Sequence, residues 1–352
     1  HKYTSKDIRC TIQNQFWFPQ SFDEALCVST RMRILCNFFR DWLFKRAKHF
    51  IIRLFINQFP LGRAGRIAMS QHKIAILTDS GTDVPEEFSK SHGIFTLPLS
   101  IQFSDGLYLD GVSITPEEVY NRLPREIPKT SLPSAEAILY TLQEIRESGV
   151  ETLFIITISS ALSGTFNLMR LTSHDVPELD CRLIDTKNIG IGAGFTVMRA
   201  AEMIDAGASA DEIEAALCCL VKSTKVFFCL PTLEYLAKGG RIGRVTATVG
   251  SLLDVRPIIS CNEEGVYYTV QKARGAVRAL AAALQNAADY AKGHAYHLAI
   301  AHGGVPELAA HVEAQLAGLI HSARSYVRTQ VSPALGVHTG PGLIGIGVQR
   351  LV

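Results

Sequence analysis

The residues best suited to chemistry follow an apolar stretch near the middle of the chain. The β-branched and aromatic run Thr152–Ile158 ends in Ser159, Ser160, Ser163 and Gly164. This pattern is typical of a buried parallel strand, a tight loop and the start of a helix. Hydroxyl groups and free amides beside the positive end of a helix dipole can bind an anion. The same serines could instead only cap the helix, and their spacing leaves both interpretations open.

Loops rich in glycine and hydroxyl residues also interrupt the strand and helix patterns at four other places. These loops are Thr78–Asp83, Lys129–Ser134, Lys238–Gly243 and His338–Gly342. None has the spacing of a P-loop, and Gly190–Gly194 lacks the dinucleotide-binding register. The chain has no HExxH or EF-hand motif, and no Gly-x-Ser-x-Gly surrounds Ser159 or Ser160. Each loop alone is therefore a weak signal of function.

Composition argues against several classes of protein. The chain has 352 residues, 47 % of them hydrophobic, and a formal net charge of +2, so there is no global charge that favours nucleic acid. No apolar run reaches the length of a membrane span, and we expect no stable membrane insertion. The eight cysteines include no CxxC pair. We expect reduced thiols, no metal, no cofactor and, without a recognisable secretory signal, a cytoplasmic protein.

From residue 73 onward the sequence alternates strand and helix patterns. Apolar strands at Ile74–Leu77, Ile94–Phe103 and Arg182–Asp185 are followed by helix patterns. We therefore predict an α/β domain over residues 71–222, with a Rossmann-like parallel sheet and helices on both faces. Residues 223–352 mix hairpins with helices, which predicts a smaller α+β domain with a mixed sheet.

The first part of the chain differs from the rest. Basic and aromatic residues alternate there, and Arg31–Phe59 taken alone could be an amphipathic helix on a membrane surface. The chain starts at His1, and Met69 stands just before the first strand of the orderly pattern. We therefore expect residues 1–70 to be a non-native or disordered extension outside the folded domains.

Taken together and in order, the loops resemble the DegV family from residue 73 to the end. The motifs that carry the resemblance are Thr78-Asp79-Ser80, Lys129–Ser134, Ser159–Thr165, Tyr235–Ile242 and His338–Gly342. The chain departs at Leu132, Ala161 and Gly243, where the family often has glutamine, glycine and serine. Leu132 removes a possible polar contact, so the preferred ligand stays open.

The resemblance implies a function. Proteins of this family bind one long-chain fatty acid between two domains, and in many bacteria present it to a fatty acid kinase that forms an acyl phosphate. This implies a lipid-binding carrier in phospholipid metabolism, without catalytic activity of its own. The implied ligand-binding residues are Thr130, Ser131, Ser160, Ser163, Gly164, His338 and Thr339. Arg241 and Arg274 are implied to meet a phosphoryl group or the kinase surface.

Two other interpretations use the same residues. Ser160 as nucleophile and His338 as base would make the protein an acyl hydrolase or transferase. The strand-to-helix turn lacks the flanking glycine of a nucleophile elbow, which argues against that activity. An anion-sensing regulatory module is the third possibility, although no DNA-binding motif accompanies it. We expect Asp79 to bond a loop amide in a structural role.

Overall fold

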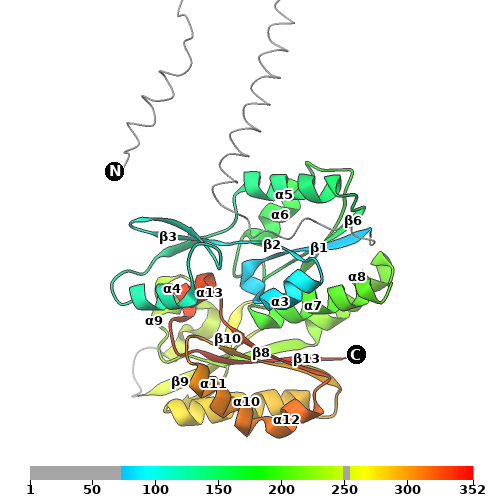
Figure 1. Ribbon diagram of the computed structural model, residues 1–352. Helices are drawn as coiled ribbons and strands as arrows, with labels where there is room; N and C mark the ends of the chain where they lie inside the picture. Colours follow the sequence, from blue (N-terminus) through cyan, green and yellow to red (C-terminus); the bar gives the residue numbers. More distant parts are fainter. Residues whose placement is uncertain (1–72, 249–253, 352) are drawn as a thin grey trace, which may run out of the picture. The chain divides into compact units, whose positions relative to one another are not determined.

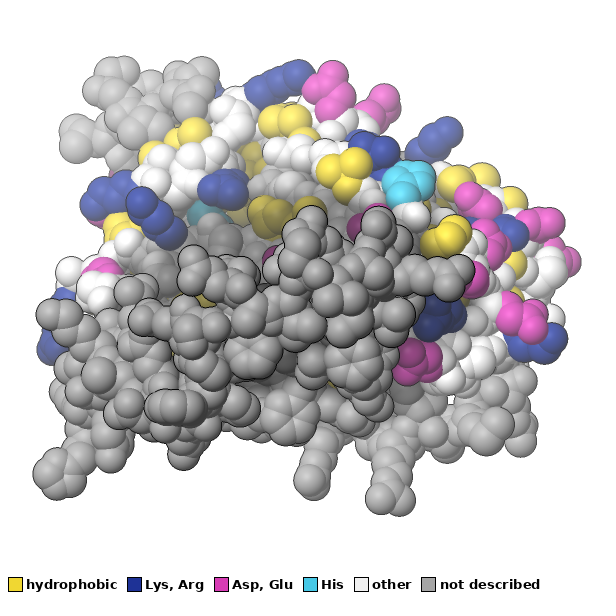
Figure 2. Space-filling view, turned by 90° about the horizontal axis from the view of Figure 1, so that it is seen from above, with side chains coloured by type: hydrophobic (Ala, Val, Ile, Leu, Met, Phe, Trp, Pro, Cys, Tyr) yellow, Lys and Arg dark blue, Asp and Glu magenta, His cyan; other side chains and the backbone are white. Residues whose placement is uncertain are grey.

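The computed structural model describes residues 73–248 and 254–351, all of them within one compact unit, Leu61–Val352. Our prediction for residues 1–70 lies outside this range. Within the described residues, no helix is both long and apolar enough to cross a membrane. Basic, acidic and hydrophobic side chains are intermixed over the described part of the face in Figure 2.

The first sheet is parallel, and its strand order is β2-β1-β6-β7. Its strands are β1 (Ile74–Asp79), β2 (Phe95–Leu97), β6 (Thr152–Thr157) and β7 (Asp180–Asp185). In the central strand β6, Leu153 and Ile155 belong to one hydrophobic cluster, whereas Phe154 and Ile156 belong to another. Because successive strand residues face opposite sides, this run of apolar residues buries both faces of the sheet.

Helices cover both of these faces (Figure 1). Those of this half are α3 (Glu86–Ser91), α5 (Ala135–Glu147), α6 (Thr165–Ser173), α7 (Ile191–Asp205) and α8 (Ala210–Lys222). Ile138 and Leu142 of α5 pack with Leu153, while Ile213 and Leu217 of α8 pack with Phe154. Ser209 caps α8 in a capping box with Glu212, which fixes the start of that helix.

A small antiparallel sheet differs from the sequence prediction. Its strands are β3 (Ser100–Phe103), β4 (Gly106–Leu109) and β5 (Lys129–Ser131). Helix α4 (Pro116–Arg122) lies between β4 and β5 in the chain. The strand predicted over Ile94–Phe103 is two strands, β2 and β3, because Pro98 and Leu99 separate them. Lys129–Ser131, predicted as loop, is a strand because it pairs with β3, with Thr130 opposite Ile101.

The last part of the chain forms a mixed sheet of order β10-β9-β8-β13-β11-β12. Its strands are β8 (Thr224–Cys229), β9 (Val255–Cys261), β10 (Tyr267–Arg274), β11 (Tyr296–His302), β12 (Ser325–Gln330) and β13 (Ile344–Arg350). The connecting helices include α10 (Ala276–Ala291), α11 (Pro306–Gln315) and α12 (Ala317–Ser322), which lie on one face of this sheet (Figure 1). The predicted fold class, a parallel sheet with flanking helices plus a mixed-sheet α+β part, is confirmed.

The two faces of β13 have different residues. Ile344, Ile346 and Val348 belong to the cluster beneath α10 and α11. Gly345 and Gly347 alternate with them and face a second cluster, where an added Cβ would lie 3.4 Å from Phe228 Cβ and 3.0 Å from Phe195 Cε2 respectively. Glycine in a strand interior often marks a place where another group approaches closely. The alternation therefore buries aliphatic side chains on one face of the sheet and lets Phe195 and Phe228 approach the backbone of β13 on the other.

Candidate functional site

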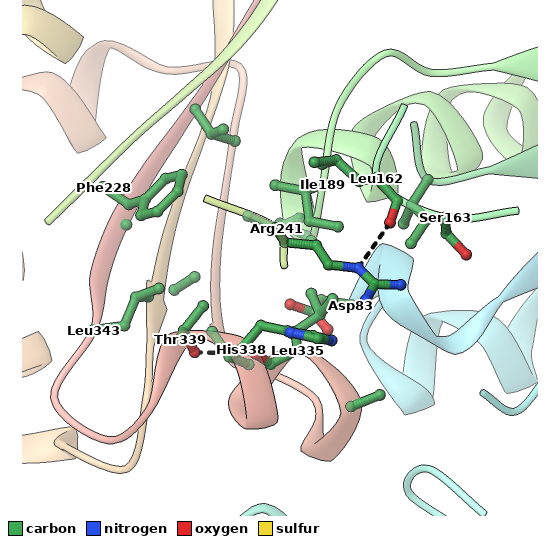
Figure 3. A pocket seen from close by; sticks show the side chains of 18 of the residues that line it. Asp83, Leu162, Ser163, Ile189, Phe228, Arg241, Leu335, His338, Thr339 and Leu343 are labelled. Atoms are coloured by element: carbon green, nitrogen blue, oxygen red, sulfur yellow. Dashed lines mark hydrogen bonds between the residues drawn. The ribbon is translucent and has the colours of Figure 1, made fainter. Parts of the chain in front are cut away.

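An apolar pocket lies on the glycine-bearing face of the mixed sheet, within the cluster that also contains residues of α7 and of the small antiparallel sheet. Its apolar lining includes Leu99, Ile158, Leu162, Ile189, Val226, Phe228, Leu335 and Leu343. Its polar lining includes Asp83, Thr130, Ser131, Ser163, Arg241, Tyr267, His338 and Thr339. Figure 3 shows Arg241, His338 and Asp83 grouped at one part of the pocket, with Phe228 and Leu343 on the sheet opposite. One pocket therefore combines an apolar wall with a polar group of residues.

Thr130 and His338 form the central polar contact. Thr130 Oγ1 lies 2.7 Å from His338 Nε2. His338 belongs to helix α13 (Pro333–Thr339), where the sequence suggested a loop. Pro333 fits the first turn of that helix, since its missing N–H is not needed there. The contact thus joins strand β5 to a helix near the C-terminus.

The imidazole of His338 is neutral in this environment. Burial, and secondarily the nearby Arg241 guanidinium, lower the pKa of His338 to about 4. Its Nδ1 is buried and has no hydrogen-bond partner among the described residues. A Cβ on Gly239 would lie 2.1 Å from that nitrogen, so only glycine fits beside the ring. His338 therefore acts as a neutral hydrogen-bonding group at ordinary pH, not as a fixed positive charge.

Arg241 supplies the positive charge of the pocket. It follows helix α9 (Glu234–Lys238) and precedes the 3-10 helix η2 (Gly243–Thr248). Its Nη1 donates to the carbonyl of Gly239 at 2.8 Å and its Nε to that of Leu162 at 3.4 Å (Figure 3). Within the described part of the chain, no carboxylate forms an ion pair with it. A partly buried guanidinium without a protein counter-ion favours an anionic ligand.

The serine loop presents Ser163, and not Ser160, to the pocket. Ser163 Oγ lies 2.8 Å from Thr165 Oγ1 at the start of α6. Ser160 is not among the described residues that line the pocket. Its amide donates to Asp185 Oδ1 at 3.1 Å, and Lys187 Nζ donates to its hydroxyl at 3.3 Å. Ser160 thus has Asp185 and Lys187 as its hydrogen-bond partners, and its expected contact with a ligand stays a prediction.

The remaining predicted site residues also divide into those that line the pocket and those that do not. Ser131 and Thr339 line the pocket, and the Thr339 hydroxyl donates to the Leu335 carbonyl at 3.2 Å. Gly164 precedes α6 without lining the pocket, and Arg274 is exposed at the end of β10. The structure thus brings Arg241 to the pocket and leaves Arg274 on the surface.

The geometry does not pair Ser160 with His338 as nucleophile and base. His338 Nε2 contacts Thr130, and no hydrogen bond joins Ser160 to His338 among the described residues. A nucleophile and its base must lie within hydrogen-bonding reach of one another. The groups that the rival interpretation requires therefore lie in separate hydrogen-bond networks.

Two aspartates near the first strand have different roles. Asp79 accepts from the amides of Gly81 at 2.9 Å and Ile158 at 3.0 Å, as its expected structural role requires. Burial raises the pKa of Asp79 to about 7, despite these two hydrogen bonds. Asp83 lines the pocket, and neither Asp83 nor Tyr267 was among the predicted site residues. Their sequence neighbourhoods resemble ordinary turn and hairpin signals, so the pattern alone could not single them out.

Comparisons with known proteins agree with this fold. Residues 73–351 match the family model described as "Uncharacterised protein, DegV family". A DegV domain-containing protein of Clostridium acetobutylicum is 38 % identical over 278 residues, which cover 79 % of this chain and 99 % of the relative.

Two solved structures are similar as well. A DegV family protein from Thermus thermophilus, described as fatty acid binding, is 28 % identical with a TM-score of 0.75, over 79 % of this chain and 99 % of its own. A stearic acid-binding protein from Eubacterium ventriosum is 28 % identical with a TM-score of 0.73, over 79 % and 98 % of the two chains. From the family match and the relative together, this chain belongs to the DegV family.

Proposed function

We propose that the protein binds one long-chain fatty acid in this pocket, as its structural relatives do. The observation that carries the proposal is the Arg241 guanidinium, which has no ion-pair partner among the described residues and lies in a mostly apolar pocket. The carboxylate would lie beside Arg241 and the Thr130–His338 pair. Ser131, Ser163 and Thr339 would contribute further hydroxyl groups near it.

The energetics of such a ligand are favourable. Burying roughly 14 methylene groups at about 0.8 kcal/mol each contributes on the order of 11 kcal/mol before costs. Association costs about 4–15 kcal/mol, so the tail provides most of the driving force. A carboxylate buried without donors would cancel much of this gain. Arg241, Thr130 and His338 would offset that loss by donating hydrogen bonds to the carboxylate, and they would thereby fix the orientation of the ligand in the pocket.

We further propose that the protein is a carrier without catalytic activity of its own. It would hold the acyl chain between an α/β domain, residues 71–222, and an α+β domain, residues 223–352. It would present the carboxylate to a fatty acid kinase for acyl phosphate formation, as a step of phospholipid metabolism. Arg274 is exposed and could meet the kinase, whereas Arg241 could meet the phosphoryl group from inside the pocket. Because such a kinase needs ATP, the proposal places the protein in the cytoplasm.

Mass spectrometry of the purified protein tests the proposal. Denaturing the protein should release one equivalent of a long-chain fatty acid, and delipidated protein should bind stearic acid again. Arg241→Gln removes the charge but keeps a long polar side chain, whereas Arg274→Gln makes the same change on the surface. Only Arg241→Gln should purify with less ligand. Wild-type protein that neither carries nor rebinds any fatty acid would contradict the proposal.

A further inference from the structure

The apolar wall of the pocket follows strand β13 and its neighbour β8. In the ladder between these strands, Gly345 lies opposite Phe228, and Gly347 lies opposite Val226. All four residues line the pocket. Because alternate residues of a strand share one face of the sheet, the two pairs are consecutive rungs on the same face. They therefore form one continuous apolar wall along the two strands.

This wall leads away from His338 and the polar residues around it. Leu343 follows His338 closely in the chain, comes just before β13, and also lines the pocket. In Figure 3, Phe228 lies beyond Leu343 as seen from His338. From Leu343 to Gly347 the strand advances by roughly 13 Å, at about 3.3 Å per residue. Gly347 therefore lies at the end of the wall that is farther from His338.

Helix α7 covers that far end. A Cβ on Gly347 would lie 3.0 Å from Phe195 Cε2 and 3.4 Å from Ile191 Cγ2. Ile191 lines the pocket, whereas Phe195 is not among the described residues that line it and is only 2 % exposed. An aromatic ring packed this closely on a strand backbone leaves no room for hydrocarbon between the two. Phe195 therefore closes the pocket at Gly347.

The next rung of the sheet is polar. Thr224, Gln349 and His297 align across β8, β13 and β11, one rung beyond Gly347. Gln349 Nε2 donates to Thr224 Oγ1 at 3.0 Å, and both residues are buried. The His297 ring lies 6.3 Å from the ring of Phe195, measured between centroids. None of the three is among the described residues that line the pocket, so its apolar wall ends at Gly347.

We propose that Phe195 sets the maximum length of the acyl chain that the protein binds. The terminal methyl group of the longest well-bound fatty acid lies at Gly347, against the Phe195 ring. Longer chains are rejected, because their last carbons find neither free space nor an apolar surface there. This inference rests on the proposed function, since it requires the carboxylate to lie beside Arg241 and His338.

A closed pocket predicts a characteristic dependence of affinity on chain length. Each methylene group that enters the apolar pocket should raise affinity about fourfold, so two carbons contribute about fifteenfold. This gain should stop when the methyl end reaches Phe195. Affinity plotted against chain length should therefore have a maximum, and its position should depend on the size of residue 195.

Binding of a series of saturated fatty acids to the delipidated full chain tests the inference. The series is myristic, palmitic, stearic, arachidic, behenic and lignoceric acid, and each affinity is expressed relative to that of palmitic acid. Wild-type protein should show a maximum within the series. Phe195→Ala should move this maximum to a longer acid. The first acid beyond the wild-type maximum should gain up to about fifteenfold relative to the acid at the maximum.

Phe195→Leu keeps the test informative if Phe195→Ala does not fold, and Phe227→Leu is its matched control. Phe227 of β8 is equally buried but belongs to the cluster on the opposite face of the sheet. Phe195→Leu should raise the same affinity ratio at least threefold, whereas Phe227→Leu should leave it unchanged.

Three results would overturn the inference while leaving the proposed function intact. They are a wild-type affinity that still rises at lignoceric acid, an unchanged maximum in the Phe195 variants, and an equal gain in Phe227→Leu. If no acid of the series binds wild-type protein, the proposed function fails, and the inference with it.

Discussion

Thr130 Oγ1 and His338 Nε2 lie 2.7 Å apart, although 208 residues separate them in the chain. Strand β5 carries the threonine because it pairs with β3 in the small sheet. Helix α13 carries the histidine, and Asp83 and Asp110 bind the amides of its first turn. The contact that we assign to the carboxylate therefore depends on two separate parts of the fold being assembled.

Removing the Thr130 hydroxyl should weaken fatty-acid binding. Thr130→Val keeps the β-branched shape that suits a strand but removes the donor. If the hydroxyl donates to a charged oxygen, the loss is about 1.5–3 kcal/mol, or about 10- to 150-fold in affinity. Titration with stearic acid measures it. Thr329→Val on β12, a strand threonine outside the pocket lining, is the control. Equal affinities of the two variants would remove Thr130 from the site.

Arg241 and Arg274 should differ in the step that they affect. Arg241→Ala removes the charge that lines the pocket and should lower fatty-acid affinity at least tenfold, because charged hydrogen bonds are the stronger ones. Arg274→Ala should keep the ligand but reduce acyl phosphate formation with a matching fatty acid kinase, since this arginine is exposed. Affinity and phosphorylation are measured separately on both variants. An Arg274→Ala protein that purifies empty would contradict this division.

The two serines of the central loop should also differ. Ser163→Ala removes a hydroxyl that lines the pocket and should weaken binding several-fold. Ser160→Ala should leave affinity within about twofold, because its partners are Asp185 and Lys187. An acyl-ester hydrolysis assay on the same proteins tests the rival activity. Hydrolysis by wild-type protein that Ser160→Ala abolishes would favour the enzyme after all.

The neutral state of His338 should make the ligand-free protein less stable in acid. Burial lowers the pKa of His338 to about 4, from its ordinary value of 6.5. The unfolded chain therefore binds a proton that the folded protein rejects, and the stability from this group falls as the pH decreases from about 6.5 towards 4. Between pH 7 and pH 5, wild-type protein should lose about 2 kcal/mol relative to His338→Gln.

Urea unfolding at the two pH values measures this difference. Buried Asp79 and Asp110, whose pKa values are raised to about 7 and about 6, act in the opposite direction, and they are common to both proteins. The comparison between variant and wild type therefore isolates the histidine. His294→Gln, at an exposed position, controls for the loss of an imidazole. Parallel stability curves for wild type and His338→Gln would show that His338 does not titrate in this way.

The part of the chain that matches the family should fold without the preceding residues. The match begins at residue 73, just after Met69. Cleavage before Met69 should leave the thermal midpoint and the bound lipid nearly unchanged. The uncleaved chain, purified in parallel, is the control. Loss of soluble protein after cleavage would show that the extension belongs to the folded unit.

The amino-acid sequence by itself determined the layers of this protein. Strand β6 has an unbroken apolar run that only a sheet covered on both faces can bury, and Ser209 with Glu212 marks a helix start. These signals are local, because they depend on which residues are neighbours along the chain. The five loop motifs were likewise sufficient to indicate the family, because their order along the chain is itself a property of the sequence.

Only the tertiary structure decided which side chains reach the pocket. Ser160 and Ser163 belong to one loop, yet Ser163 lines the pocket while Ser160 forms hydrogen bonds with Asp185 and Lys187, from the next strand and its loop. Arg241 resembles a surface charge in the sequence, yet the backbone carbonyls of Leu162 and Gly239 hold its guanidinium in the pocket. Asp83 follows the first strand, yet it lines the pocket and accepts a hydrogen bond from the amide of Ser332, near the other end of the chain. Side-chain direction in a loop depends on partners distant in the chain, and local pattern carries no information about them.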